Sequence, residues 1–86
     1  MNESKSYEQE LAGWLARLRE EKGISQEALG VQLGKGQSDI AKIENGSRRV
    51  GVIEMLAWMS ALDIPFERVE LLLRPIYSSI NRKPTI

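Results

Sequence analysis

The fold is decided by residues 25–46, which have the sequence SQEALGVQLGKGQSDIAKIENG. Ser25 is suited to cap a first short helix, and Gly34 offers the left-handed conformation in which a helix stops and the chain turns. A second short helix can begin after Gly36 and end at the Asn45-Gly46 pair. Two short helices joined by so tight a glycine turn cannot stack antiparallel, so we expect them to cross steeply.

Gly30 supports this crossing. A glycine inside a helix costs about 1 kcal/mol relative to alanine, so its presence requires a packing reason. Gly30 falls where the two helices would approach most closely, and a side chain larger than a methyl group would push them apart. Leu29 and Leu33 would form the buried face of the first helix, and Ile40 and Ile43 that of the second. The segment therefore indicates a helix-turn-helix.

Apolar residues recur at helical spacing on both sides of this segment. Upstream, the stripe of Leu11, Leu15 and Leu18 predicts a helix over residues 7–22, with Ser6 as its N-terminal cap. Such an apolar stripe is typical of a helix that buries one face in a common core.

Two more helices are predicted downstream. A helix over residues 52–62 would place five apolar residues on one face: Val52, Met55, Leu56, Met59 and Leu62. Pro65 suits the first position of a fifth helix, which should stop before Pro75 and give the core Phe66, Val69 and Leu72. The rest, IYSSINRKPTI, alternates weakly and predicts a short strand or an ordered arm. The fold class is therefore all-α with five helices.

Composition excludes several classes of protein. Eighty-six residues suffice for one domain, and the chain has neither cysteine nor histidine. A disulfide scaffold, a thiolate metal site and any catalytic arrangement that needs histidine are excluded, so we expect no enzymatic activity, no cofactor and no metal. The apolar runs are too short to cross a bilayer, and the polar N-terminus lacks the apolar stretch of a signal peptide. We expect a cytoplasmic protein.

Charge is segregated along the chain, although the formal net charge is zero. Residues 35–49 hold four basic residues against two acidic ones, and residues 50–73 hold four acidic residues against one basic. Three further basic residues follow from Arg74 onward. A neutral total argues mildly against a nucleic-acid partner, so the distribution is more informative than the sum.

The register of residues 25–46 resembles the Cro and phage-repressor type of helix-turn-helix, also called the xenobiotic-response-element family. The matching residues stand at the family's spacing without gaps: Ser25-Gln26, Leu29, Gly34, Ile40 and Glu44-Asn45-Gly46. The likeness spans about residues 11–73, and RRVGVIEMLAWMSALDI resembles members whose fourth helix follows a double-arginine loop. The chain departs from the family at Gly30, where most members carry alanine.

The resemblance implies a lambda-repressor-like domain with the helix-turn-helix at its second and third helices. We divide the chain into a polar N-terminal arm with the start of the first helix over residues 1–10, a DNA-binding domain over residues 11–74, and a C-terminal tail over residues 75–86. The tail is a candidate dimerisation arm. The family consists of bacterial and phage transcriptional regulators, so double-stranded DNA is the expected partner.

The resemblance also implies that the third helix is the recognition helix and lies in the major groove. Gln37, Ser38 and Lys42 occupy its outward face and are the candidates for base contact, since glutamine can bond adenine bidentately and lysine suits guanine acceptors. The alternative is that these polar residues form an ordinary solvated helix face.

Other positions would hold the protein on the DNA backbone. Gln26 matches the family's phosphate-clamping glutamine and would lie at a helix N-terminus, which attracts anions. Arg48 and Arg49 would reach the phosphates beside the half-site, in contacts that carry affinity but little sequence information. The family pattern further pairs Arg19 with Glu44, which would tie the first helix to the end of the recognition helix.

Two features leave alternatives open. Asp39 stands where related members carry a neutral or aromatic residue, and it could accept from a cytosine amino group or simply favour the start of its helix. We favour the second role. Trp14 and Trp58 could stack on bases, but both lie within or beside core stripes, so we expect them to pack in the core.

Selectivity argues for a homodimer on a palindromic operator, since one helix-turn-helix contacts too few base pairs, and half-sites would lie about 34–36 Å apart. We predict the dimer interface at Leu73, Ile76, Tyr77 and Ile80, because the fifth helix and the tail hold more apolar residues than one face can bury. An acidic stretch beside a basic tail would also suit an isologous contact. The alternative is a tail that folds back on its own chain.

The sequence therefore predicts a sequence-specific regulator of transcription, and more narrowly a repressor. One alternative is the antitoxin of a toxin–antitoxin pair, which would bind a toxin and also repress the shared promoter. The other is a helix-turn-helix module that binds only protein, for which the neutral net charge and Asp39 are the supporting observations.

Overall fold

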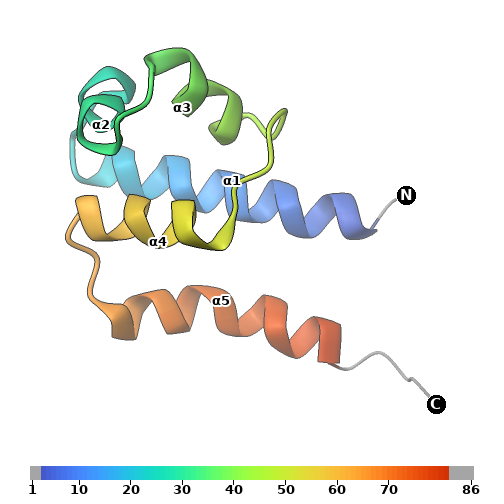
Figure 1. Ribbon diagram of the computed structural model, residues 1–86. Helices are drawn as coiled ribbons and strands as arrows, with labels where there is room; N and C mark the ends of the chain where they lie inside the picture. The colour runs from blue at the N-terminus through green and yellow to red at the C-terminus, as the bar shows by residue number, and fades with distance from the viewer. Residues whose placement is uncertain (1–2, 82–86) are drawn as a thin grey trace.

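Over residues 3–81 the protein folds into five helices around one core, and Figure 1 shows how the helices are arranged. The computed structural model describes residues 3–81. The helices are α1 (Glu3–Glu21), α2 (Gln26–Leu33), α3 (Gln37–Glu44), α4 (Val52–Ala61) and α5 (Phe66–Asn81). Since no strand occurs within this range, the predicted all-α class is confirmed. None of these helices is long and apolar enough to span a membrane.

The caps of α2 follow the sequence prediction. The Ser25 hydroxyl accepts a hydrogen bond from the Ala28 amide at 3.0 Å. Gly34 ends the helix in a left-handed conformation with φ of 69°. Any residue with a Cβ atom would be less stable in this conformation than glycine. Gly36 is the N-cap of α3, in an extended conformation. The chain therefore turns between α2 and α3 where the glycines allow it.

Gly30 is the point of closest approach, and the fit is tighter than the sequence indicates. A Cβ atom on Gly30 would lie 2.6 Å from the backbone oxygen of Lys35. Even a methyl group would therefore require the turn to shift, because the neighbour is backbone and not a flexible side chain. Glycine at this position sets the distance between α2 and the start of α3.

The core lies where α1 to α4 meet. Its largest fully buried side chains come from these four helices and from the residue that directly follows α4: Leu15, Leu29, Ile40, Ile43, Trp58, Met59 and Leu62. The Trp58 indole nitrogen donates to the Leu15 backbone oxygen at 3.2 Å, so its one polar group is satisfied. Trp58 thus packs in the core as expected, while Trp14 is half-buried.

The predicted start of the first helix is wrong. Helix α1 begins at Glu3, so Ser6 lies inside it and does not act as its N-cap. The helix could extend because residues 3–6 include neither proline nor glycine and nothing in their sequence stops it. The polar start of the chain is therefore continuous with the helix that carries Leu15 and Arg19.

The predicted end of the fifth helix is also wrong. Helix α5 continues through Pro75 to Asn81, so residues 75–81 form neither a strand nor an extended arm. A proline inside a helix costs about 3 kcal/mol, and local propensity alone favours a stop. Contacts beyond the proline favour continuation: Ile76 is half-buried, and the hydroxyls of Ser79 and Tyr7 lie 3.1 Å apart. The end of the tail, residues 82–86, lies outside the described range.

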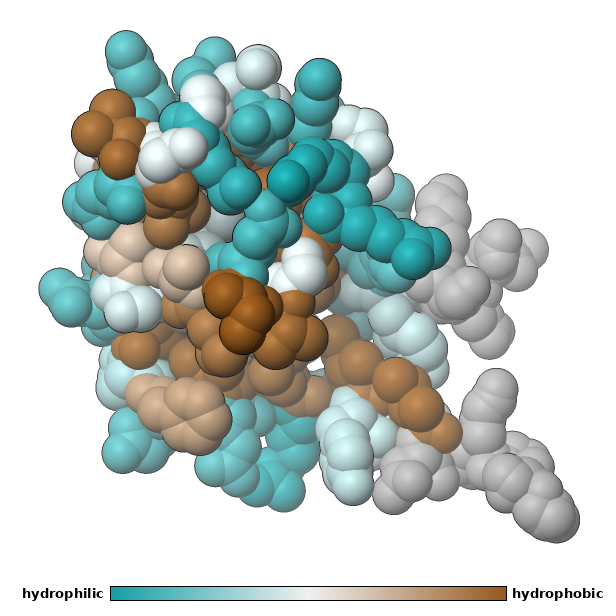
Figure 2. Space-filling model, viewed as in Figure 1, coloured by the Kyte–Doolittle hydropathy of each residue, from teal (hydrophilic) through white to brown (hydrophobic). Residues whose placement is uncertain are grey.

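Helices α4 and α5 bury fewer apolar residues than their spacing predicts. Val69 is buried and Leu72 is half-buried, but Phe66 is 70% exposed, and Val52 and Leu56 also face outward. Fewer side chains of α5 therefore pack against the core than the helical spacing predicts. Figure 2 shows the consequence, since apolar side chains gather on the surface over α4 and α5.

Candidate nucleic-acid interface

Helices α2 and α3 lie together on one side of the molecule, above α1 and α4 (Figure 1). Helix α3 buries Ile40 and Ile43 in the core, which fixes which of its sides faces outward. Gln37, Ser38 and Lys42 are all exposed, so the three predicted base-contacting residues share the outward side. A helix that projects polar side chains in this way has the shape that enters a major groove.

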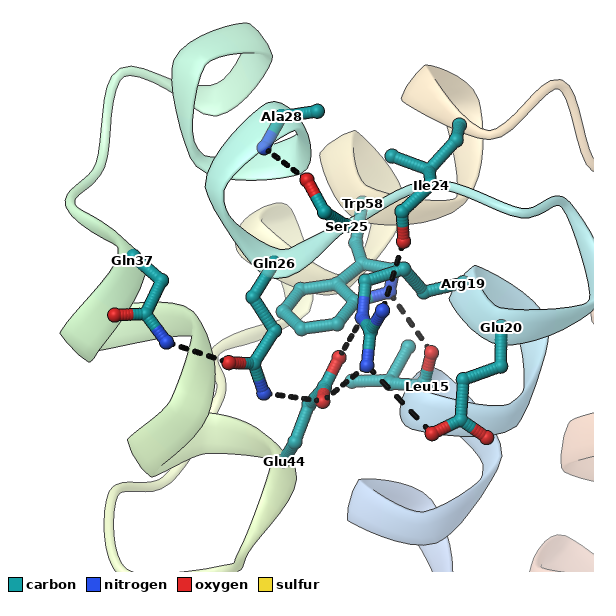
Figure 3. Close-up of polar contacts among 10 residues, drawn as sticks. All are labelled: Leu15, Arg19, Glu20, Ile24, Ser25, Gln26, Ala28, Gln37, Glu44 and Trp58. Carbon is teal, nitrogen blue, oxygen red and sulfur yellow. Dashed lines mark hydrogen bonds and ion pairs between the residues drawn. The ribbon is translucent and has the colours of Figure 1, made fainter.

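An ion pair fixes the end of α3 to α1. The Arg19 Nε donates to Glu44 Oε2 at 2.6 Å, and its Nη2 donates to Glu44 Oε1 at 3.0 Å (Figure 3). The side chains are only 11% and 7% exposed. The third guanidinium nitrogen donates to the Ile24 backbone oxygen at 2.7 Å. The hydrogen bonds that Arg19 donates to Glu44 raise the pKa of Arg19 above its ordinary value.

Two glutamines extend this ion pair to the start of α3. Gln26 Nε2 donates to Glu44 Oε1 at 2.9 Å, and Gln37 Nε2 donates to Gln26 Oε1 at 2.6 Å (Figure 3). A continuous chain of hydrogen bonds therefore runs from Arg19 through Glu44 and Gln26 to Gln37. The sequence identified each residue separately but gave no signal that the two glutamines meet, because that contact depends on the crossing of α2 and α3.

The geometry of Gln37 suits base recognition. One N–H of its amide is used by Gln26, which leaves the second N–H and the oxygen for another partner. A glutamine offers adenine one donor and one acceptor, so this arrangement keeps both groups that a bidentate contact needs. The bond to Gln26 also restrains the side chain before any ligand arrives.

The two loop arginines differ in their surroundings. Arg49 is 84% exposed, and its Nε lies 3.4 Å from the Glu8 carboxylate. Arg48 turns toward α4, where its Nη2 donates to Glu54 Oε2 at 2.9 Å. That hydrogen bond raises the pKa of Arg48. Asp39, half-buried in the first turn of α3, contributes to the same rise through its charge.

Sequence reasoning missed Glu54. This carboxylate forms ion pairs with Lys35 Nζ at 2.7 Å and with Arg48 Nη2 at 2.9 Å. It also accepts a hydrogen bond from the Gly51 amide at 3.2 Å. The hydrogen bonds from Lys35 and Arg48 and from the Gly51 amide lower its pKa to about 2. Its position three residues after the N-cap Gly51 signals the backbone bond, but no local pattern signals the two cations.

The residues predicted for the dimer interface differ in exposure. Leu73 is half-buried against the chain's own core and Ile76 is half-buried, whereas Tyr77 and Ile80 are exposed. Beside them, a groove runs between α4 and α5, and its exposed apolar lining residues are Val52, Leu56, Phe66 and Tyr77, with the charged pair Glu70 and Arg74 also on its lining. The apolar surface is thus wider than predicted and includes the outer side of α4.

Comparison with known proteins agrees with this geometry. No curated protein matches the chain closely enough to count as a relative. A helix-turn-helix family model, HTH_3, matches residues 15–69, well over half of the chain. The match includes both partners of the Arg19–Glu44 pair and the whole of α2, α3 and α4. The chain therefore belongs to the Cro/C1-type helix-turn-helix family of DNA-binding regulators.

Proposed function

We propose that the protein is a transcriptional repressor that binds a palindromic operator as a homodimer, with α3 in the major groove. The observation that carries this proposal is the hydrogen-bond chain from Arg19 to Gln37, which holds the outward side of α3 in one orientation. A side chain that is fixed before binding loses less entropy on contacting a base, so a restrained recognition helix favours selective binding.

In this proposal the side chains that contact DNA bases are those of Gln37, Ser38 and Lys42. Gln37 presents a donor and an acceptor for adenine, and Lys42 can donate to guanine. Ser38 can pair with several bases and therefore adds less selectivity. Lys42 lies in the last turn of α3, so the three residues span the length of the exposed side.

Contact with phosphates falls to Gln26 and Arg49. Gln26 is the first residue of α2, and the N-terminus of a helix favours an anion. Arg49 extends into solvent and can leave the weak pair with Glu8, since exposed ion pairs contribute only about 0–1 kcal/mol. Arg48 is held by Glu54 and would contribute charge near the backbone with less freedom to approach it.

A homodimer is supported by the exposed apolar residues of α4 and α5. Val52, Phe66 and Tyr77 are each more than 60% exposed and line the same groove, and a groove lined by exposed large apolar side chains is typical of an interaction surface. A second copy of the chain can cover them by presenting the same groove about a two-fold axis. Each operator half-site would then receive one α3.

The test compares two alanine variants on an operator selected from a random DNA pool. Gln37→Ala should cost about 1–3 kcal/mol on that operator and relax the preference at one base position. Arg49→Ala should weaken binding to all sequences alike and lower the salt slope by about one unit. Indistinguishable effects of the two substitutions would contradict α3 as the recognition helix.

A further inference from the structure

One carboxylate on α4 joins the segments that enter and leave α3. Lys35 precedes α3 by two residues and Arg48 follows its end by four. Both cations bind the same oxygen of Glu54, at 2.7 Å and 2.9 Å. The other oxygen accepts from the Gly51 amide, which fixes the carboxylate at the start of α4. We call Glu54, Lys35 and Arg48 the Glu54 cluster.

The cluster withholds charge from the surface around α3. The side chains of Lys35, Glu54 and Arg48 are 21%, 28% and 37% exposed, in contrast to the 84% of Arg49. The second terminal nitrogen of Arg48, Nη1, is shielded from solvent. A lysine or arginine that is paired with a carboxylate of its own chain is poorly placed to replace the counterions of DNA, so the cluster reduces the number of cations available to phosphates.

We propose that Glu54 is a positioning residue that determines how strongly the protein prefers its operator over other DNA. It anchors both ends of α3, which keeps the base-contacting residues in register. It also holds Lys35 and Arg48 away from phosphates, whose contacts strengthen binding to any sequence. This inference rests on the proposed DNA-binding function, and it concerns the ratio of specific to non-specific affinity.

The test compares Glu54→Gln with Glu67→Gln by titrating salt on operator and on unrelated DNA. Glu67 is an exposed carboxylate in the first turn of α5, so its substitution removes the same charge without touching the cluster. In Glu54→Gln we expect tighter binding to unrelated DNA and a salt slope steeper by about one to two units, since each freed cation adds about 0.9. The ratio of operator to unrelated affinity should fall by about one decade.

A measurement without DNA separates this inference from the proposed function. Amide hydrogen exchange should become faster in residues 35–36 and 47–50 of Glu54→Gln, and the core amides of α1 should remain protected. Glu67→Gln should change neither set. A salt slope and a specificity ratio equal to those of Glu67→Gln would overturn the proposal, whatever the exchange rates show.

Failure of the proposed function has a different signature. A wild-type protein that prefers no sequence would refute operator binding and with it the specificity role of Glu54. The exchange data would then report by themselves whether Glu54 holds the two segments.

Discussion

The side of the molecule formed by α2 and α3 and the side formed by α4 and α5 are stabilised in different ways. On the first, polar groups meet partners from the same chain, and the chain of bonds from Arg19 to Gln37 leaves α3 with one orientation. On the second, Phe66 and Tyr77 remain about 70% exposed, and over residues 66–80 of α5 only Val69 is buried. The difference supports the proposal that a second copy of the chain covers the apolar side, whereas the polar groups of the other side find their partners within one chain.

The largest expected effect concerns the polar side. Glu44→Ala should lower the free energy of unfolding by about 3–5 kcal/mol, because it leaves the Arg19 guanidinium buried and unpaired. Urea denaturation measures this loss. Glu20→Ala is the matched control, since Glu20 lies 3.7 Å from the same arginine but is 64% exposed and should cost less than about 1 kcal/mol. Equal unfolding midpoints for the two variants would show that the polar side is not fixed by this pair.

The next effect concerns the apolar side. Tyr77→Ser should weaken the homodimer by about 2 kcal/mol, roughly 30-fold in its dissociation constant, while the folded monomer stays intact. Sedimentation and circular dichroism measure the two properties. Leu71→Ser is the control, because Leu71 is similarly exposed on α5 but does not line the groove. A wild-type protein that is monomeric at high concentration would favour a different partner for this groove, as the antitoxin hypothesis requires.

A smaller effect tests the crossing on which the polar side depends. Gly30→Ala should lower stability by about 1 kcal/mol, because the 2.6 Å approach to the Lys35 oxygen costs more than the gain in helix propensity. Gly13→Ala in α1 makes only a 3.4 Å contact with the Arg17 side chain and should instead raise stability by about 0.5–1 kcal/mol. Thermal melts of both variants show whether each substitution raises or lowers the stability. A higher melting temperature for Gly30→Ala would contradict the steric clash with the Lys35 backbone oxygen.

The smallest effect is a pH dependence of stability. Glu54 has a folded pKa of about 2 against an ordinary value of 4.5, so it stabilises the fold above pH 4.5 and loses this contribution as the pH falls toward 2. The melting temperature of Glu54→Gln should therefore decline less over this interval than that of the wild type. Parallel curves for the two proteins would show that the contacts of Glu54 with Lys35 and Arg48 contribute nothing to stability.

Much of the polar side was predictable because its signals are local. Ser25, Gly34 and Gly36 act through their own backbone conformations and their immediate neighbours, and α2 and α3 begin and end where these residues require. Ile40 and Ile43 fix the outward side of α3 by helical period alone. The placement of Gln37, Ser38 and Lys42 on that side follows from the same period.

The apolar side was predicted less well because its outcome depends on distant contacts. Pro75 is a stop signal by local propensity, yet α5 continues to Asn81, with Ser79 beside Tyr7 of α1. Phe66 lies at helical spacing from Val69, but only Val69 is buried. Helical periodicity shows which way a side chain points, but it does not show whether a neighbouring helix extends far enough to cover that side chain.

The sequence by itself determined the class of the fold, the position of the helix-turn-helix and the residues that α3 presents, because these depend on backbone conformation and helical period. Only the tertiary structure decided that Gln26 binds Gln37 and Glu44, and that Glu54 binds Lys35 and Arg48. These contacts join residues from separate elements over short distances. They form only once packing in the core has fixed where each helix lies.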